Sequence, residues 1–136
     1  MKKIVLAPDS FKGTMSALEI CRIMSKAIIR SFPRCEVVSI PMADGGEGTV
    51  DCFLTSVRGE KVRLEISGPY FEKTEGFYGI LSGGTAVIEM AAAAGLPMVK
   101  GKENPGKTTT YGVGQLIADA LKKGCRHIIL GLGGSC

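Results

Sequence analysis

Residues 2–10 read KKIVLAPDS, and this stretch decides the fold class. Its apolar, partly β-branched centre is typical of a buried parallel strand, predicted over residues 2–7, that runs into a polar loop. A helix is predicted next over residues 16–32, because Ser16 and Glu19 form a capping box. A second strand over residues 36–40 completes a β-α-β unit, so the sequence predicts an α/β fold.

The pattern changes after a short predicted helix over residues 47–57. Residues 60–67 alternate charged and apolar side chains, which is typical of a strand with one face in water. Two more strands are predicted over residues 74–81 and 85–90, joined by a Ser-Gly-Gly hairpin turn. We therefore predict a parallel first portion over residues 1–60 and a second portion with antiparallel strands over residues 61–136.

The last third of the chain returns to helix and strand. Four alanines at residues 91–94 predict a helical turn, and a helix is expected from Thr109 or Thr110 to about residue 123. Residues 127–130 predict a short buried strand that leads into a glycine-rich end of the chain.

Composition excludes several classes of protein. The 136 residues are 45% hydrophobic and 22% charged, as in a globular domain. The net charge is only +4, there is no Trp, and no run of Lys or Arg exceeds a pair, so we expect no nucleic-acid surface. The first apolar run is too short for a signal peptide or membrane span. We expect five reduced, mostly buried cysteines in a cytoplasmic protein and a structural role for His127.

The first loop that could form part of a functional site is PDSFKGT, residues 8–14, at the carboxyl end of the first predicted strand. Ligands of open α/β sheets bind beyond such strand ends. Asp9 could hold a metal or a hydroxyl group, Ser10 could donate a hydrogen bond, and Lys12 could bind phosphate or carboxylate. Alternatively, Asp9 is a turn residue and Lys12 a solvated side chain.

The second such loop is ADGGEGT, residues 43–49, which opens the second predicted helix. Its glycines let the backbone approach a ligand, and a helix N-terminus attracts anions. Asp44 and Glu47 argue against a bare phosphate cradle and fit a bound metal or substrate hydroxyls better. The alternative is a tight turn in which Glu47 only complements the helix dipole.

The third loop is LGLGGS, residues 130–135. A strand that runs into a glycine-rich loop begins many nucleotide sites. Because no Gly-Lys-Ser/Thr follows, the loop is not a Walker A motif, and it is not a complete dinucleotide fingerprint either.

Together these segments resemble the bacterial glycerate kinases with a two-domain α/β architecture. The matching segments follow the family's order and approximate spacing from the first residue to nearly the last: IVLAPDSFK (4–12), MADGGEGT (42–49), AVIEMAAA (86–93) with Gly95 and Leu96, Asn104 and Pro105 with Thr108 and Thr109, GVGQLI (112–117) and HIILGLGGS (127–135).

The resemblance implies a Rossmann-like domain with a second α/β domain inserted into it and an active site in the cleft between them. It also implies D-glycerate and ATP as substrates, Mg²⁺ as a cofactor, and no nucleic-acid or membrane partner. It further implies that Asp9, Ser10, Lys12, Asp44 and Glu47 face the cleft. We predict catalytic roles for Asp9, Lys12 and Asp44, substrate contacts at Ser10, Gly45, Gly46, Glu47, Thr49 and Glu89, and nucleotide or phosphate contacts at Gly131, Gly133, Gly134 and Ser135. No metal ligand is assigned.

The sequence also departs from the family pattern. Cys136 stands where the family has alanine, Gly13 and Thr14 stand where Glu and Ser are common, and family members are more than twice as long. We therefore expect a truncated chain with little activity alone, which associates with itself or with a complementing C-terminal fragment. The alternatives are a non-catalytic module that binds small anions and the remnant of an interrupted gene.

Overall fold

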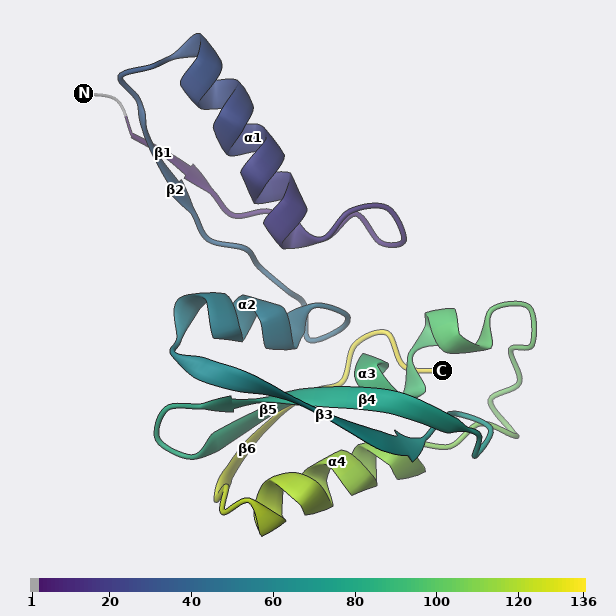
Figure 1. The fold of residues 1–136 in the computed structure, drawn as a ribbon. Coiled ribbons are helices and arrows are strands. Elements are labelled where there is room, and N and C mark those ends of the chain that lie inside the picture. Colours follow the sequence, from purple (N-terminus) through teal and green to yellow (C-terminus); the bar gives the residue numbers. More distant parts are fainter. Residues whose placement is uncertain (1–2) are drawn as a thin grey trace. The chain divides into compact units, whose positions relative to one another are not determined.

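The computed structural model describes residues 3–136, and the chain divides into two compact units between Ala43 and Asp44 (Figure 1). The division falls before the boundary that the sequence predicts at residue 60, because helix α2 (Thr49–Ser56) packs on the sheet of the second unit. The assignment of the two portions to a first and an inserted domain stays a prediction.

The first unit confirms the predicted β-α-β arrangement. Strand β1 (Lys3–Leu6) and strand β2 (Glu36–Ser39) pair in parallel, with helix α1 (Ala17–Ser31) between them in sequence. The predicted capping box starts α1. The Ser16 hydroxyl oxygen accepts from the N–H of Glu19, whose carboxylate accepts from the N–H of Ser16. Lys2, which the prediction included in the first strand, lies outside the described residues.

The prediction that the first strand is buried is wrong for most of its length. Leu6 is buried, but Val5, which the strand alternation places on the opposite face, is 54% exposed. Ser39 of β2 marks the helix side of this sheet, because its hydroxyl lies 3.1 Å from that of Ser25 on α1. Helix α1 therefore covers one face of the two-stranded sheet, and apolar side chains on the other face remain exposed.

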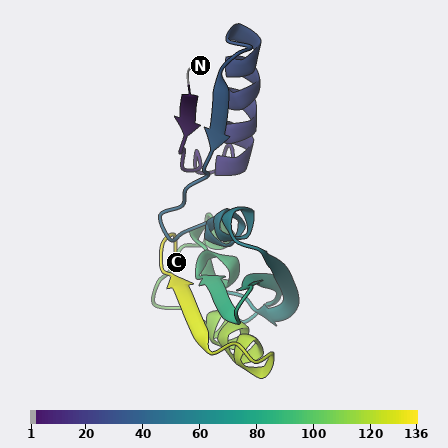
Figure 2. The same ribbon diagram turned by 90° about the vertical axis from the view of Figure 1, so that its left-hand side faces the viewer.

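The second unit is built on a four-stranded mixed sheet, which confirms the predicted α/β class (Figures 1 and 2). The strands β3 (Gly59–Ser67), β4 (Lys73–Leu81) and β5 (Thr85–Glu89) are antiparallel neighbours, and β6 (His127–Gly131) pairs with β5 in parallel. The predicted hairpin is confirmed: Leu81 pairs with Thr85, and Gly83 and Gly84 both adopt the positive φ angles that the tight turn requires.

Helices cover both faces of this sheet. Val50 of α2 packs with Leu81 and Val87 on one face. On the other face, α3 (Ala91–Ala94) and α4 (Tyr111–Lys122) form the larger core with Ile66, Tyr78, Ala86 and Ile88, and the short 3₁₀ helix η1 (Leu96–Val99) follows α3. Because both faces of β5 are covered, Ala86, Val87 and Ile88 are all fully buried.

The sheet has an exposed edge at β6. The sequence predicts a buried strand here, but Ile129 is 40% exposed and Leu130 is 37% exposed. The prediction is wrong because β6 ends the strand order and has one neighbour, β5, among the described residues. Within residues 3–136, no helix is long and apolar enough to cross a membrane.

The two glycines near the start of α4 differ in what surrounds them. A Cβ atom on Gly112 would lie 2.1 Å from the backbone oxygen of Ser67, whereas a Cβ on Gly114 would meet nothing within 4 Å. We therefore expect Gly112→Ala to lower the free energy of unfolding by roughly 1–3 kcal/mol, as overpacking does. The matched control, Gly114→Ala, should raise it by about 0.5–1 kcal/mol through helix propensity. Urea denaturation measures both, and equal effects would contradict the packing of α4 on β3.

Candidate active site

Two of the three candidate loops lie side by side in the second unit. Residues 44–48 lead into α2, and residues 131–135 follow β6. The N–H of Gly133 donates to the carbonyl oxygen of Gly45 at 3.0 Å. Because β5 and β6 are parallel, the loop after Gly131 leaves the sheet at the edge where β5 also ends. The structure thus brings together the residues that the sequence places in two separate loops.

The two loops approach so closely that glycine is required. A Cβ atom on Gly131 would lie 2.4 Å from the backbone oxygen of Gly45. One on Gly133 would lie 2.7 Å from the backbone nitrogen of Gly46. Both distances are far below van der Waals contact, and backbone atoms cannot move aside as the end of a side chain can. These glycines therefore have a packing role whether or not they contact a ligand.

The N-terminus of α2 is bound by a carboxylate from another part of the chain. Glu89, the last residue of β5, is 1% exposed, and its two carboxylate oxygens accept from the N–H of Gly48 at 3.2 Å and of Val50 at 2.8 Å. The sequence predicts that this helix end is open to an external anion. That part of the prediction is wrong for these two donors, because the chain itself supplies the negative charge.

The surroundings of Glu89 shift its protonation. Burial raises the pKa of the Glu89 carboxyl above the usual 4.5, and Asp51 adds to the rise. The hydrogen bonds from Val50 and Gly48 and the charge of Lys61 oppose it. Because the folded pKa lies above the unfolded one, this group favours folding most below pH 4.5, and the contribution is lost as the pH rises through the raised pKa.

The polar side chains of residues 44–49 differ in exposure. Asp44 and Glu47 are exposed, and one oxygen of Asp44 accepts from the N–H of Gly46 at 2.9 Å. Thr49 is buried, and its hydroxyl donates to the carbonyl oxygen of Gly46 at 2.7 Å. Asp44 and Glu47 are thus presented to solvent by a loop that is held internally.

The loop after β6 is fixed by residues that sequence reasoning missed. Ser135 forms an isolated β-bridge with Gly95, and the N–H of Leu96 donates to the carbonyl oxygen of Gly134 at 2.8 Å. Gly134 itself has a φ of 68°. The family resemblance includes the pair Gly95 and Leu96, but no local sequence pattern predicts that this pair contacts residues 134 and 135.

The remaining candidate loop, residues 8–14, belongs to the first unit. One oxygen of Asp9 accepts from the N–H of Ser10 at 2.6 Å. Lys12 is exposed in a tight turn closed by Phe11 and Met15, whose backbones pair as an isolated bridge. Asp9, Ser10 and Lys12 therefore lie together in the loop after β1.

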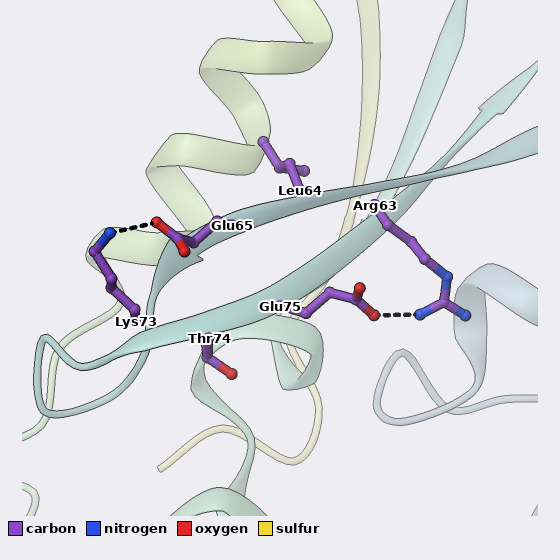
Figure 3. Close-up of a pocket in the computed structure, with 6 residues that line it drawn as sticks. All are labelled: Arg63, Leu64, Glu65, Lys73, Thr74 and Glu75. Atoms are coloured by element: carbon purple, nitrogen blue, oxygen red, sulfur yellow. Dashed lines mark hydrogen bonds and ion pairs between the residues drawn. The ribbon is translucent and has the colours of Figure 1, made fainter.

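A surface hollow is lined by residues of β3 and β4 (Figure 3). Two ion pairs flank it: Arg63 with Glu75 at 2.7 Å and Lys73 with Glu65 at 2.9 Å. All four side chains are more than half exposed, and such pairs contribute only about 0–1 kcal/mol each. No residue of the predicted site lines the hollow.

Several other sequence predictions can be placed. His127 is exposed at the start of β6, and the described residues contain no group of three or more His, Cys, Asp or Glu able to hold a metal. Thr110 is the N-cap of α4 without a side-chain bond, and the Thr109 hydroxyl oxygen accepts from the N–H of Tyr111. Of the five cysteines, only Cys21 and Cys125 are buried.

Comparisons with known proteins give one consistent result. A family model described as "Glycerate kinase family" matches residues 4–136. A glycerate kinase of Bacillus cereus is 47% identical over 135 residues, and a glycerate 2-kinase of Escherichia coli is 45% identical over 135 residues. Each alignment covers 98% of this chain and 35% of the relative.

A solved structure agrees with these relatives. A crystal structure from Salmonella typhimurium LT2, provisionally assigned as glycerate kinase 2, is 43% identical and superposes with a TM-score of 0.79. The match covers 98% of this chain and 36% of that one. The chain thus spans about a third of the length of the proteins that it matches.

The close approach of the two loops can be tested by substitution. Gly131→Ala places a methyl group against the carbonyl of Gly45, so the loops must separate and the Gly133 N–H must lose its acceptor. We expect amide hydrogen exchange of residues 44–48 and 131–135 to accelerate at least tenfold, corresponding to about 1.4 kcal/mol of local stability. Gly106→Ala is the control, since its Cβ would meet only Asn104 at 3.4 Å. Unchanged exchange in Gly131→Ala would contradict the packing.

Proposed function

Because this chain belongs to the glycerate kinase family, we propose that it forms part of an enzyme that transfers the γ-phosphoryl group of ATP to D-glycerate. The observation that carries the proposal is the pair of glycine-rich loops at one edge of the sheet, within the segment that matches the family. Phosphoryl transfer depends on positioning and charge neutralisation, and such loops supply both backbone access and charged side chains.

The loop 131–135 is the better place for the phosphates of ATP. The first-turn N–H groups of α2 at Gly48 and Val50 already donate to Glu89, so an external phosphate would compete with an internal carboxylate. The loop after β6 is glycine-rich and follows the carboxyl end of a parallel strand, where ligands of α/β sheets bind. We propose nucleotide contacts at Gly131, Gly134 and Ser135, and at Gly133 through atoms other than its N–H, which donates to Gly45.

Mg²⁺ fits this proposal without a dedicated cluster of ligands. Magnesium commonly arrives with nucleotide phosphates, keeps several waters and takes one or two carboxylates from the protein. Asp44, an exposed carboxylate in the loop beside residues 131–135, offers one such group. When bound, the ion would neutralise charge on the phosphates during transfer.

The acceptor would be held by the polar residues of the first two loops. We propose that Asp9, Lys12 and Asp44 are catalytic: a carboxylate can orient a reacting hydroxyl group and take its proton, and a lysine can neutralise the charge of glycerate or phosphate. Ser10, Gly45, Gly46, Glu47 and Thr49 are the proposed substrate contacts. The internal bond of the Thr49 hydroxyl to Gly46 leaves that oxygen as an acceptor.

We also propose a partner for the first unit. Parallel sheets are normally covered on both faces, yet Val5 and Ile40 are 54% and 42% exposed on β1 and just beyond β2, and Ile23 of α1 is 53% exposed. The relatives contain about twice as much further polypeptide as this chain matches. We propose that polypeptide of that kind extends the two strands into a Rossmann-like sheet and covers these side chains. The complete protein would then be a cytoplasmic enzyme.

Reconstitution tests the function and the partner together. We expect the 136-residue chain alone to show no turnover and to self-associate in light scattering, because its apolar face is uncovered. Adding the polypeptide that follows the matched segment in the Bacillus cereus relative should give a discrete complex with glycerate-dependent ATP consumption. That polypeptide alone is the control. Turnover of about 1–100 s⁻¹ by the chain alone would contradict the need for a partner. Binding of glycerate without turnover would favour an anion-binding module.

The role of Asp44 can be separated from its place in the fold. In Asp44→Asn, the amide oxygen still accepts from the N–H of Gly46, but the negative charge is lost. We expect the reconstituted complex to lose at least 10²-fold in kcat, the usual range for a residue that handles a proton. Glu65→Gln, which removes a surface carboxylate from β3, should change kcat less than twofold. Equal activity of the two variants would remove Asp44 from the catalytic set.

A further inference from the structure

Glu89 is a buried carboxylate for which the proposed chemistry has no direct use. It is 1% exposed at the end of β5, and its two oxygens accept from N–H groups that lie 41 and 39 residues away in the sequence. A carboxylate is seldom fully buried unless it is paired or hydrogen-bonded, so these two hydrogen bonds are what allow Glu89 to be buried. Both oxygens are directed at the start of α2 and not at solvent.

Helix α2 lacks a cap of its own. Its N-cap is Gly48, which has a φ of 90° and no side chain to accept a hydrogen bond. The carboxylate of Glu89 on β5 caps the helix instead, because it accepts the hydrogen bonds that an N-cap side chain would accept. It also complements the positive end of the helix dipole. The conformation of the glycine-rich loop at its helix end is therefore set by β5.

The influence of Glu89 continues into the second loop through hydrogen-bonded backbone. The carbonyl oxygen of Gly46 accepts from both the N–H and the hydroxyl of Thr49, the residue between the two N–H donors to Glu89. Next to Gly46, the carbonyl oxygen of Gly45 accepts from the N–H of Gly133. Glu89 is thus connected to residues 131–135 by contacts that all lie within the second unit.

We propose that Glu89 is a positioning residue that holds the loops 44–48 and 131–135 in their relative arrangement, and that it does so without contacting substrate. The sequence-based prediction gave it a substrate contact, and the geometry points to a different role. The importance of this role for catalysis rests on the proposed function, because only then do the two loops form part of an active site.

Few charged groups surround this carboxylate. Asp51 of α2 and Lys61 of β3 act on it and pair with each other at 2.8 Å. β6 presents Gly131 beside it in register, and α3 consists of four alanines. β4 pairs with β5 only as far as Val87. A change in the charge of Glu89 is therefore sensed mainly by the backbone groups that it binds.

Amide NMR of the isotope-labelled 136-residue chain within the reconstituted complex provides the test. In the unaltered chain, the Gly48 and Val50 amide shifts should titrate together with an apparent pKa above 4.5, and the Gly133 amide should follow. Glu89→Gln offers an amide group of equal size that cannot accept at both positions, so the titration should vanish. Exchange of the Gly48 and Val50 amides should accelerate at least tenfold, while that of Val87 in the core stays within threefold.

Controls and contrary outcomes follow from the same spectra. Glu65→Gln removes an exposed carboxylate and should leave the shifts and exchange of all these amides unchanged. Glu89→Asp keeps the charge on a shorter side chain and should restore part of the titration. The proposal is overturned if Glu89→Gln leaves exchange at Gly48 and Val50 unchanged, or if Gly133 does not follow the titration.

A separate measurement distinguishes this proposal from the proposed function. Turnover of the reconstituted complex with unaltered chain decides whether the enzyme is a glycerate kinase. If turnover is absent while the amides behave as expected, the function fails and the positioning role stands. If turnover is present, Glu89→Gln should reduce kcat at least tenfold, and full kcat in this variant would overturn the catalytic importance of the positioning.

Discussion

The arrangement of the second unit depends on one buried carboxylate and the backbone that it binds. Burial of the Glu89 carboxylate costs desolvation free energy, and the same burial raises the pKa of its carboxyl. Two N–H donors at the start of α2 offset part of that cost. Few residues could replace it, because the helix begins at a glycine that has no side chain to cap its own donors. The end of β5, the start of α2 and the glycine loop between Asp44 and Gly48 therefore form one connected structure.

The first unit leaves one face of its two-stranded sheet exposed. A helix on one side of two parallel strands buries Leu6, Ile20 and Cys21, but the other side of the sheet has no covering layer within this unit. Two strands and one helix bury too little apolar surface to be stable alone. The four-stranded sheet of the second unit is different, since helices lie on both faces and β5 is fully buried. The two units therefore differ in how much of their apolar surface they cover themselves.

The features that the sequence predicted well are local ones. The capping box of Ser16 and Glu19 joins residues three positions apart, and the Gly83-Gly84 turn follows from the backbone angles that a tight hairpin needs. The burial of β1 and β6 was predicted wrongly, because an apolar strand is buried only if neighbours cover it. The bond between Glu89 and Val50 could not be predicted either, since 39 residues separate them and a carboxylate before an alanine run suggests nothing about a distant helix.

The internal carboxylate also changes how the glycine-rich loops should be interpreted. A helix that begins after glycines is commonly taken as a phosphate site, because its N–H groups and dipole attract an anion. Here that attraction is already used by Glu89, so the glycines of residues 45–48 serve close packing and turn geometry instead. An anion bound nearby would meet the exposed carboxylates of Asp44 and Glu47, which repel it unless a cation intervenes. In the proposed function, this loop therefore holds a hydroxyl group or a metal ion, and the loop that follows β6 binds the phosphates.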